Sequence, residues 1–179
     1  MTREFSVVPP GKAAWNTILA LVLLVPLAVL GGVLLTSPAP SMATIAPGFG
    51  LTVGLCVAVA LLLILSLRRL RVSIEDDRLV VRAALYARRV PLTDLDVKAA
   101  RIVDLDTVSE WRPVLRMNGI GLPGASIGHF RGRPFRRRFF CALTSRQRVL
   151  VLPERGGERF LLLSLERPQV LLEALQTRQ

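Results

Sequence analysis

Most of the first third of the sequence lacks charge. No acidic, basic or histidine residue occurs between Trp15 and Leu67, and three arginines, Arg68, Arg69 and Arg71, close this run. The run is too long for the core of a small soluble domain, but it has room for two membrane crossings of about 20 residues each. The absence of ionisable groups within it argues against a proton relay or an ion pathway. We therefore expect two membrane spans that serve as an anchor.

Cysteine and histidine are scarce. The chain has two cysteines, Cys56 and Cys141, a single histidine, His129, and no CxxC motif or Cys/His cluster. This pattern suggests neither a disulfide framework nor a metal site. No serine or cysteine nucleophile has a recognisable relay with the lone histidine, and a lone histidine in a turn-rich segment is more often structural. The sequence therefore predicts no catalytic residues, no metal and no cofactor, and we expect a protein that is not an enzyme.

The uncharged run divides into two expected spans. The first covers residues 15–35, with Pro26 bending its middle, and the second covers residues 48–67. Residues 36–47 hold three prolines and no charge, and we expect them to form the loop between the spans. At about 1.5 Å per residue, each span matches the hydrocarbon thickness of a bilayer. A signal peptide cleaved at Ser41-Met42-Ala43 is the alternative, but its apolar core would be unusually long.

Basic residues lie on both outer flanks of the spans and are absent from the loop between them. Arg3 and Lys12 precede the first span, and the arginines that begin at Arg68 follow the second. The positive-inside rule therefore places both residues 1–14 and residues 68–179 in the cytoplasm.

Small residues recur at every fourth position of the second span, at Gly50, Gly54 and Ala58. This spacing places them on one helix face, where they permit close helix approach. Gly31 and Gly32 lie at a similar depth in the first span. We expect the two spans to pack there as an antiparallel pair, and dimerisation through the same face is the alternative.

From Val72 onward the apolar pattern has a period of two, which is typical of strands. The expected elements are a hairpin around Asp76-Asp77, a strand over residues 97–105, a turn-rich segment over residues 106–135, a meander over residues 139–163 and a short helix that Ser164 caps. We therefore predict an α+β protein in which a two-helix transmembrane hairpin precedes a bent sheet or barrel. The C-terminal helix would cover one open end of that sheet.

The soluble part resembles a bacterial pleckstrin-homology-like domain of the type that follows two membrane spans. The residues that carry the resemblance are 72–81, 90–95, 116–124, 128–131, the 139–152 segment and the final helix. The resemblance implies a fold, a bacterial cytoplasmic membrane as the location, and a platform that binds lipid headgroups, peptides or proteins. It supplies no catalytic residues, and a fold alone does not settle function.

Arginines and phenylalanines cluster in one segment of the soluble part. The five arginines are Arg131, Arg133, Arg136, Arg137 and Arg138, with no acid among them and with Phe130, Phe135, Phe139 and Phe140 interleaved. Arginine binds phosphate through two parallel hydrogen bonds, and an anionic leaflet attracts each nearby basic residue by about 1 kcal/mol. The segment is therefore our candidate lipid- or anion-binding surface, with Arg68 and Arg69 as further candidates. A solvated hairpin tip and another anionic ligand are the alternatives.

The chain carries a net charge of +11, but only two of its 24 basic residues are lysines. An arginine excess of this kind also arises from the composition of a GC-rich genome. A membrane anchor makes nucleic acid an unfavourable partner. We expect a binding domain at the inner leaflet that contacts anionic lipid or a membrane partner. The alternative is an assembly subunit of a membrane complex without lipid recognition, and the sequence leaves the oligomeric state open.

Overall fold

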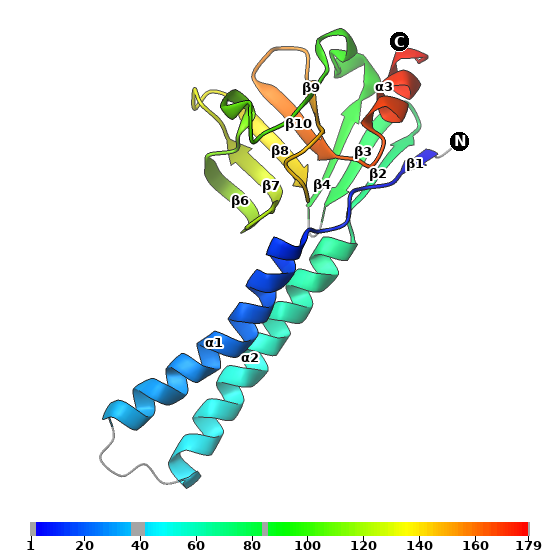
Figure 1. The fold of residues 1–179 in the computed structure, drawn as a ribbon. Helices are drawn as coiled ribbons and strands as arrows, with labels where there is room; N and C mark the ends of the chain where they lie inside the picture. The colour runs from blue at the N-terminus through cyan, green and yellow to red at the C-terminus, as the bar shows by residue number, and fades with distance from the viewer. Residues whose placement is uncertain (1–2, 37–41, 84–85, 179) are drawn as a thin grey trace. The chain divides into compact units, whose positions relative to one another are not determined.

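The computed structural model describes residues 3–36, 42–83 and 86–178 (Figure 1). The chain forms two units, one of Lys12–Leu65 and one that joins Met1–Gly11 to Ser66–Gln179. The first unit contains the helices α1 (Lys12–Thr36) and α2 (Met42–Arg68). Both helices are long and apolar enough to cross a membrane, and only 11% and 22% of their most apolar windows are buried. The core helix of a soluble protein would instead be mostly buried.

The second helix begins earlier than the sequence suggests. It starts at Met42 rather than near Gly48, so Pro47 lies inside it. One proline near the start of a long apolar helix removes a single backbone hydrogen bond, which such a helix tolerates. Thr36 of the expected loop is instead the last residue of α1. The rest of that loop, residues 37–41 with Ser41 of the alternative cleavage site, lies outside the described residues.

The glycines expected to bring the helices together have open space beside them. A Cβ atom built on Gly31, Gly32, Gly50 or Gly54 meets no other atom within 4 Å, and Ala58 is exposed. The described structure therefore has no close contact at these positions, and a packing role for them stays a prediction.

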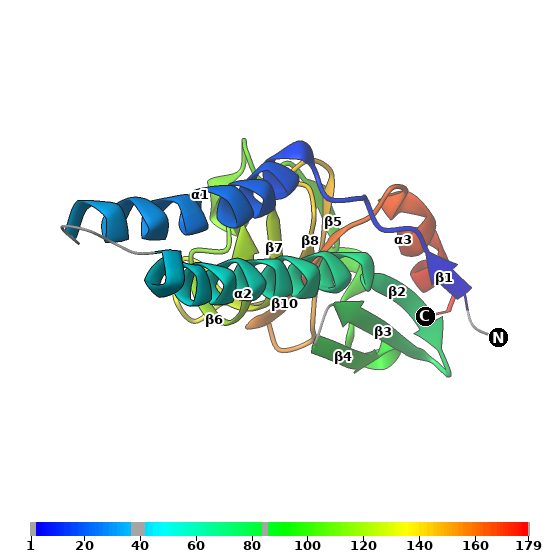
Figure 2. The same ribbon diagram turned by 90° about the horizontal axis from the view of Figure 1, so that it is seen from below.

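The described part of the second unit contains two sheets, one α-helix and three short 3-10 helices, and Figures 1 and 2 show their arrangement. The four-stranded sheet consists of β1 (Arg3–Phe5), β2 (Arg71–Glu75), β3 (Arg78–Ala83) and β4 (Tyr86–Pro91), antiparallel and in chain order. The six-stranded sheet has the order β5-β9-β10-β8-β7-β6 and consists of β5 (Arg101–Val103), β6 (Leu115–Leu122), β7 (Ala125–Arg131), β8 (Arg138–Leu143), β9 (Val149–Pro153) and β10 (Arg159–Ser164). The helix α3 (Pro168–Gln176) follows β10 and lies beside β1 and β2 in both views. The predicted α+β class is confirmed.

The N-terminal segment belongs to this unit, which no pattern in the sequence indicates. Strand β1 pairs with β2, although α1 and α2 separate these two strands in the sequence. The backbone N–H of Val8 donates to the Ser164 carbonyl at 3.2 Å, and the N–H of Glu166 donates to the Ser6 carbonyl at 3.1 Å. Residues 3–8 of the segment expected over residues 1–14 therefore pair with this unit, and the cytoplasmic location of that segment stays a prediction.

The predicted hairpin around Asp76-Asp77 is confirmed as the β2–β3 hairpin. Asp76 and Asp77 adopt φ values of 46° and 57°, the left-handed conformation that a two-residue hairpin turn requires at both positions. Strands β9 and β10 are likewise joined by the expected loop, which has Gly156 and Gly157 at positive φ.

Other expectations for this unit are wrong. Residues 97–105 form a short 3-10 helix (Val97–Ala99) followed by β5, because Asp96 accepts a hydrogen bond from the Ala99 N–H and stabilises a helical turn. Strands β8 and β9 do not form a hairpin, since β10 lies between them and runs parallel to β8. Ser164 ends β10 and donates its hydroxyl to the Ser145 carbonyl at 2.8 Å. Pro168 occupies the first turn of α3, where a proline costs no helical hydrogen bond.

The segment expected to contain mainly turns, residues 106–135, holds the hairpin of β6 and β7. Its glycines concealed the strands, because an interior glycine contributes no side chain to an alternating pattern. Residues 115–118 of β6 are all exposed, so β6 shows no alternation at its start. A turn in this segment connects β6 to β7, where Gly124 has φ 83°.

The six-stranded sheet is buried on both faces at its centre. One face carries a cluster that contains Phe130, Phe139 and Phe160 from three neighbouring strands, with Trp111 packed against them. The opposite face presents Phe140 and Leu161, which are in register and buried. The buried central strands therefore determine to which face of the sheet the side chains at their ends point.

Candidate anion-binding site

Three arginines form a row at one end of the six-stranded sheet. Arg131 ends β7 and is in register with Arg138 at the start of β8, which is in register with Arg159 at the start of β10. Residues directly opposite each other in a sheet point to the same face. We call these three residues the arginine ladder. The ladder lies on the face opposite the Phe139 ring, because Phe139 is one residue further along β8 than Arg138.

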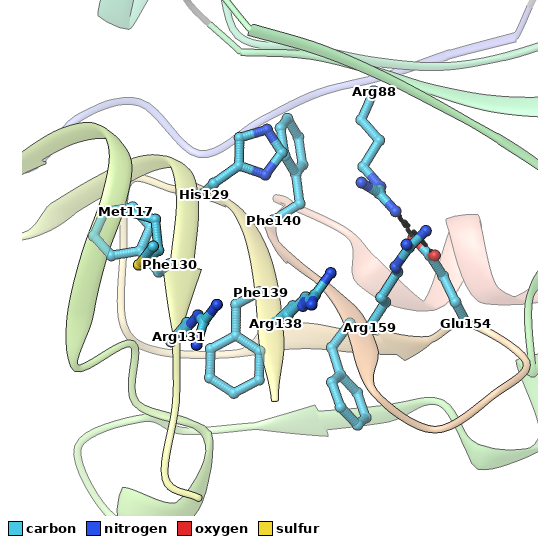
Figure 3. Close-up of a pocket in the computed structure, with 11 residues that line it drawn as sticks. Arg88, Met117, His129, Phe130, Arg131, Arg138, Phe139, Phe140, Glu154 and Arg159 are labelled. Atoms are coloured by element: carbon cyan, nitrogen blue, oxygen red, sulfur yellow. Dashed lines mark hydrogen bonds and ion pairs between the residues drawn. The ribbon is translucent and has the colours of Figure 1, made fainter. Parts of the chain in front are cut away.

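A groove of about 410 Å³ lies over the ladder (Figure 3). The strands of the six-stranded sheet form its floor, and β4 contributes Arg88 to its wall. The side chains that line the groove also include His129, Phe140, Met117 and Glu154. Four arginines and one glutamate line the groove, so it carries a formal net charge of three positive units.

The single acid of the groove is already paired. Glu154 accepts hydrogen bonds from Arg88 at 2.6 and 3.0 Å through one oxygen and at 2.9 Å through the other. Their side chains are 11% and 24% exposed, respectively, so this pair is shielded from solvent and holds its geometry. Figure 3 shows the pair meeting at one side of the groove. Because Glu154 is satisfied by Arg88, it does not neutralise the ladder.

The ladder arginines have no carboxylate partner within 4 Å among residues 3–36, 42–83 and 86–178. Like charges directly opposite each other on neighbouring strands are destabilising. The three guanidinium groups therefore repel one another across the end of the sheet, and an anion in the groove would relieve that repulsion.

His129 lies beside the ladder on the same face of the sheet. Its ring packs edge-on against Phe140, with 5.1 Å between centroids, and against Tyr86 of β4 at 6.1 Å. Partial burial lowers the pKa of His129, and the positive charge of Arg88 lowers that pKa further. A neutral imidazole offers one hydrogen-bond donor and one acceptor at pH 7.

The groove shows no arrangement for nucleophilic catalysis in the described residues. Cys141 is fully buried, burial raises the pKa of its thiol, and its side chain lies on the sheet face opposite His129. Asp104 and Asp106 do not line the groove. No group of three His, Cys, Asp or Glu residues within the described ranges could hold a metal ion.

The loop between β7 and β8, residues 132–137, extends the cationic surface. The N–H of Gly132 donates to the Arg137 carbonyl at 3.1 Å, and the N–H of Arg137 donates to the Pro134 carbonyl at 3.0 Å. Phe135 is 55% exposed at the tip. A second cavity joins Phe135 to Arg136 and to the ladder. The loop is thus a closed turn that projects one aromatic ring among arginines.

The structure separates the five clustered arginines into three roles. Arg131 and Arg138 belong to the ladder, while Arg133 and Arg136 are exposed on the loop, with Arg136 only 3.4 Å from Glu158. Arg137 stacks 4.8 Å from the Trp111 ring centre and bonds Glu110 at 2.7 Å, an arrangement that ties the loop to the core.

Arg68 and Arg69 line neither cavity. Arg68 is the last residue of α2, and both side chains are exposed. The sequence reasoning missed Arg159, Arg88 and Glu154. Arg159 joins the ladder through the parallel pairing of β10 with β8, and no local sequence signal indicates that pairing. The consecutive arginines of β4, half-buried Arg88 and exposed Arg89, were the available signal for the groove wall.

Comparison of the chain with protein-family models, with curated proteins and with solved structures finds no match in any of the three.

Proposed function

We propose that this chain is a non-enzymatic integral membrane protein of the bacterial cytoplasmic membrane. Its helices α1 and α2 cross the bilayer and anchor a pleckstrin-homology-like domain whose 132–137 loop contacts anionic lipid at the inner leaflet. The exposed apolar surface of both helices supports the crossing, because water disfavours such a surface and lipid does not.

The pairing of β1 with β2 supports two crossings. These strands flank the helical unit in the chain and lie side by side in one sheet. A chain that leaves the sheet, crosses a bilayer and returns to the same sheet must cross an even number of times. The basic residues on both flanks support a cytoplasmic location for the sheet.

The exposed tip of the 132–137 loop is the observation that carries the lipid contact. Phe135 is more than half exposed between Arg133 and Arg136. An aromatic ring among arginines suits the interface of an anionic bilayer, where the ring enters the headgroup layer and the guanidinium groups bind phosphates. The chain passes from Arg68 at the end of α2 to Arg71 at the start of β2, so weak contacts suffice at the high effective concentration of a short tether.

Hydrogen exchange tests this contact in the full-length protein. In phosphatidylglycerol nanodiscs, we expect slower amide exchange in peptides covering residues 132–137 than in neutral phosphatidylcholine nanodiscs. The turn at residues 144–148, at the other end of β8, serves as an internal control. Replacing Arg133 and Arg136 by Gln and Phe135 by Ser should remove the difference. Equal exchange in both lipids would overturn the leaflet contact.

The exposed edge of β6 favours a second candidate, an assembly subunit that binds another membrane protein. Strand β6 is the edge of the six-stranded sheet, and Leu115 and Met117 on it are 47% and 53% exposed. An open edge with apolar side chains can accept a further strand. A lipid-independent complex with a partner, lost when Met117 is replaced by Lys, would favour this candidate.

A further inference from the structure

The arginine ladder has a stability cost that the fold does not explain. Arg131, Arg138 and Arg159 stand in register on three neighbouring strands, where strands are about 4.8 Å apart. A single substitution at Arg138 would relieve repulsion on both sides, because that residue has a ladder neighbour on each flank. Three unpaired guanidinium groups at the floor of a concave groove are an arrangement suited to an anion.

We propose that the groove over the ladder is a specific binding site for a phosphate-bearing anion. Arg138 and Arg159 would bind the phosphate oxygens, and Arg131 would extend the site toward the 132–137 loop. If the anion is a lipid headgroup, the inference deepens the proposed function and rests on it. If the anion is a free molecule, the inference is independent of that function. A free phosphorylated molecule would bind through the same chemistry.

The geometry favours phosphate over a carboxylate. A carboxylate has two oxygens and satisfies one arginine fork, whereas a phosphate monoester presents three oxygens and can bridge two neighbouring forks. A volume of about 410 Å³ lies within the range of about 300–1,000 Å³ for small-molecule sites. It therefore leaves room for more than a single phosphate group.

The side chains in the walls of the groove add selectivity for the part of the ligand next to the phosphate. The Arg88–Glu154 pair closes one side without consuming a ladder arginine. His129 lies on the ladder face with Phe140 and Tyr86 around its ring, so it can donate to or accept from the part of the ligand next to the phosphate. Met117 adds an apolar contact from β6.

The test uses the full-length protein without a histidine tag in phosphatidylcholine nanodiscs, with its histidine ring labelled with ¹³C. His129 is the only histidine, so its ring signal needs no assignment. Inorganic pyrophosphate is titrated at constant ionic strength. A second arm compares nanodiscs containing phosphatidic acid, which carries a terminal phosphate, with nanodiscs containing phosphatidylglycerol, which does not.

We expect a saturable shift of the His129 signal, with pyrophosphate if the site takes a free ligand and with phosphatidic acid alone if it takes a headgroup. Replacing Arg159 by Gln should weaken binding about tenfold or more, because each hydrogen bond to a charged group contributes roughly that factor. Arg159→Lys keeps the positive charge but lacks the guanidinium fork. Its affinity should lie between that of the wild type and that of Arg159→Gln. Arg101→Gln, on the edge strand β5 and the opposite face, removes the same charge and should bind as the wild type does.

Removing Arg159 should also raise the melting temperature of the free protein, since it relieves like-charge repulsion, and this result separates lost binding from misfolding. The absence of a saturable shift in both arms would overturn the proposal, as would a shift that survives Arg159→Gln unchanged. Arg159 lies outside the 132–137 loop. A His129 response without loop protection would therefore overturn the leaflet contact alone.

Discussion

At the residue scale, His129 is the most informative side chain in the domain. This exposed residue of β7 has its ring edge-on to Tyr86 of the four-stranded sheet and to Phe140 of the six-stranded sheet, and the positive charge of Arg88 acts on it. Burial and the charge of Arg88 both favour the neutral ring. Protonation of His129 therefore opposes the native arrangement of the groove.

The lowered pKa of His129 predicts a pH-dependent loss of stability. The folded-state pKa lies below the unfolded value of 6.5, so the unfolded chain binds the extra proton first. The contribution of His129 is then complete above pH 6.5 and declines as the pH falls from 6.5 toward the folded-state pKa. Thermal unfolding of the full-length protein between pH 7.5 and 5 measures it. The His129→Gln variant should lose less stability over this interval, and parallel losses in both proteins would contradict the prediction.

Arg137 shows that neighbouring residues in one charged run can have different tasks. Its guanidinium stacks on Trp111 and bonds Glu110, whereas the next residue, Arg138, points into the groove. The sequence shows the cluster, and anion binding by it stays a prediction. The sequence could not separate these roles, because they depend on Trp111, which lies more than twenty residues earlier in the chain, and on β10.

At the element scale, the β6–β7 hairpin depends on a close approach of two glycines. Gly119 and Gly128 are in register. A Cβ atom on Gly119 would lie 2.2 Å from the Ile127 carbonyl oxygen, and one on Gly128 would lie 2.5 Å from the Asn118 carbonyl oxygen. Gly128 also has φ 110°, a conformation that side chains rarely adopt.

Replacing Gly128 by Ala should therefore destabilise the domain by about 2 kcal/mol or more, since strain and a backbone clash act together. The displaced hairpin should also remove Met117 from the groove. Gly121→Ala in the same hairpin is the control, because its Cβ would meet only the Arg116 side chain, at 3.9 Å. Thermal unfolding compares the two. Equal stability of both variants would show that β6 and β7 separate without cost.

The sequence predicted those elements that local chemistry determines. The Asp76-Asp77 turn, the β9–β10 loop and the apolar face of α3 follow from neighbouring residues. The pairing of β10 with β8 and of β1 with β2 brings together residues distant in the chain, and no periodicity indicates which strands will meet. The ladder was missed for this reason. Its third member, Arg159, joins the other two only through the parallel pairing of β10 with β8.

At the scale of the whole molecule, the long helices form an insertion within one domain. The domain begins with β1, continues after α2 with β2, and has its two parts joined by sheet hydrogen bonds. This arrangement requires both flanks of the helical unit to lie on the same side of the proposed bilayer. It also makes the first strand part of the domain's stability.

A cross-link tests the insertion. Glu4 and Ser73 are directly opposite each other on β1 and β2, where Cα atoms are about 4.5–5.5 Å apart, a separation that a disulfide can bridge. Under mild oxidation in native membranes, we expect the Glu4→Cys, Ser73→Cys double variant to form an intramolecular disulfide, visible as a mobility change that reductant reverses. Each single variant is the control. A double variant that stays reduced would place β1 away from β2 in the membrane-bound protein.

The depth of Phe135 in a bilayer tests the central proposal most directly. A spin label at Phe135→Cys and a control label at Gln147→Cys, at the other end of β8, would be compared in full-length protein. The parent protein, whose two cysteines are buried, sets the background. We predict that the label at 135 lies at the depth of the lipid phosphates in anionic nanodiscs and moves into water in neutral ones, while the label at 147 stays in water in both. A label at 135 that remains in water in anionic nanodiscs would contradict a domain that contacts the charged leaflet.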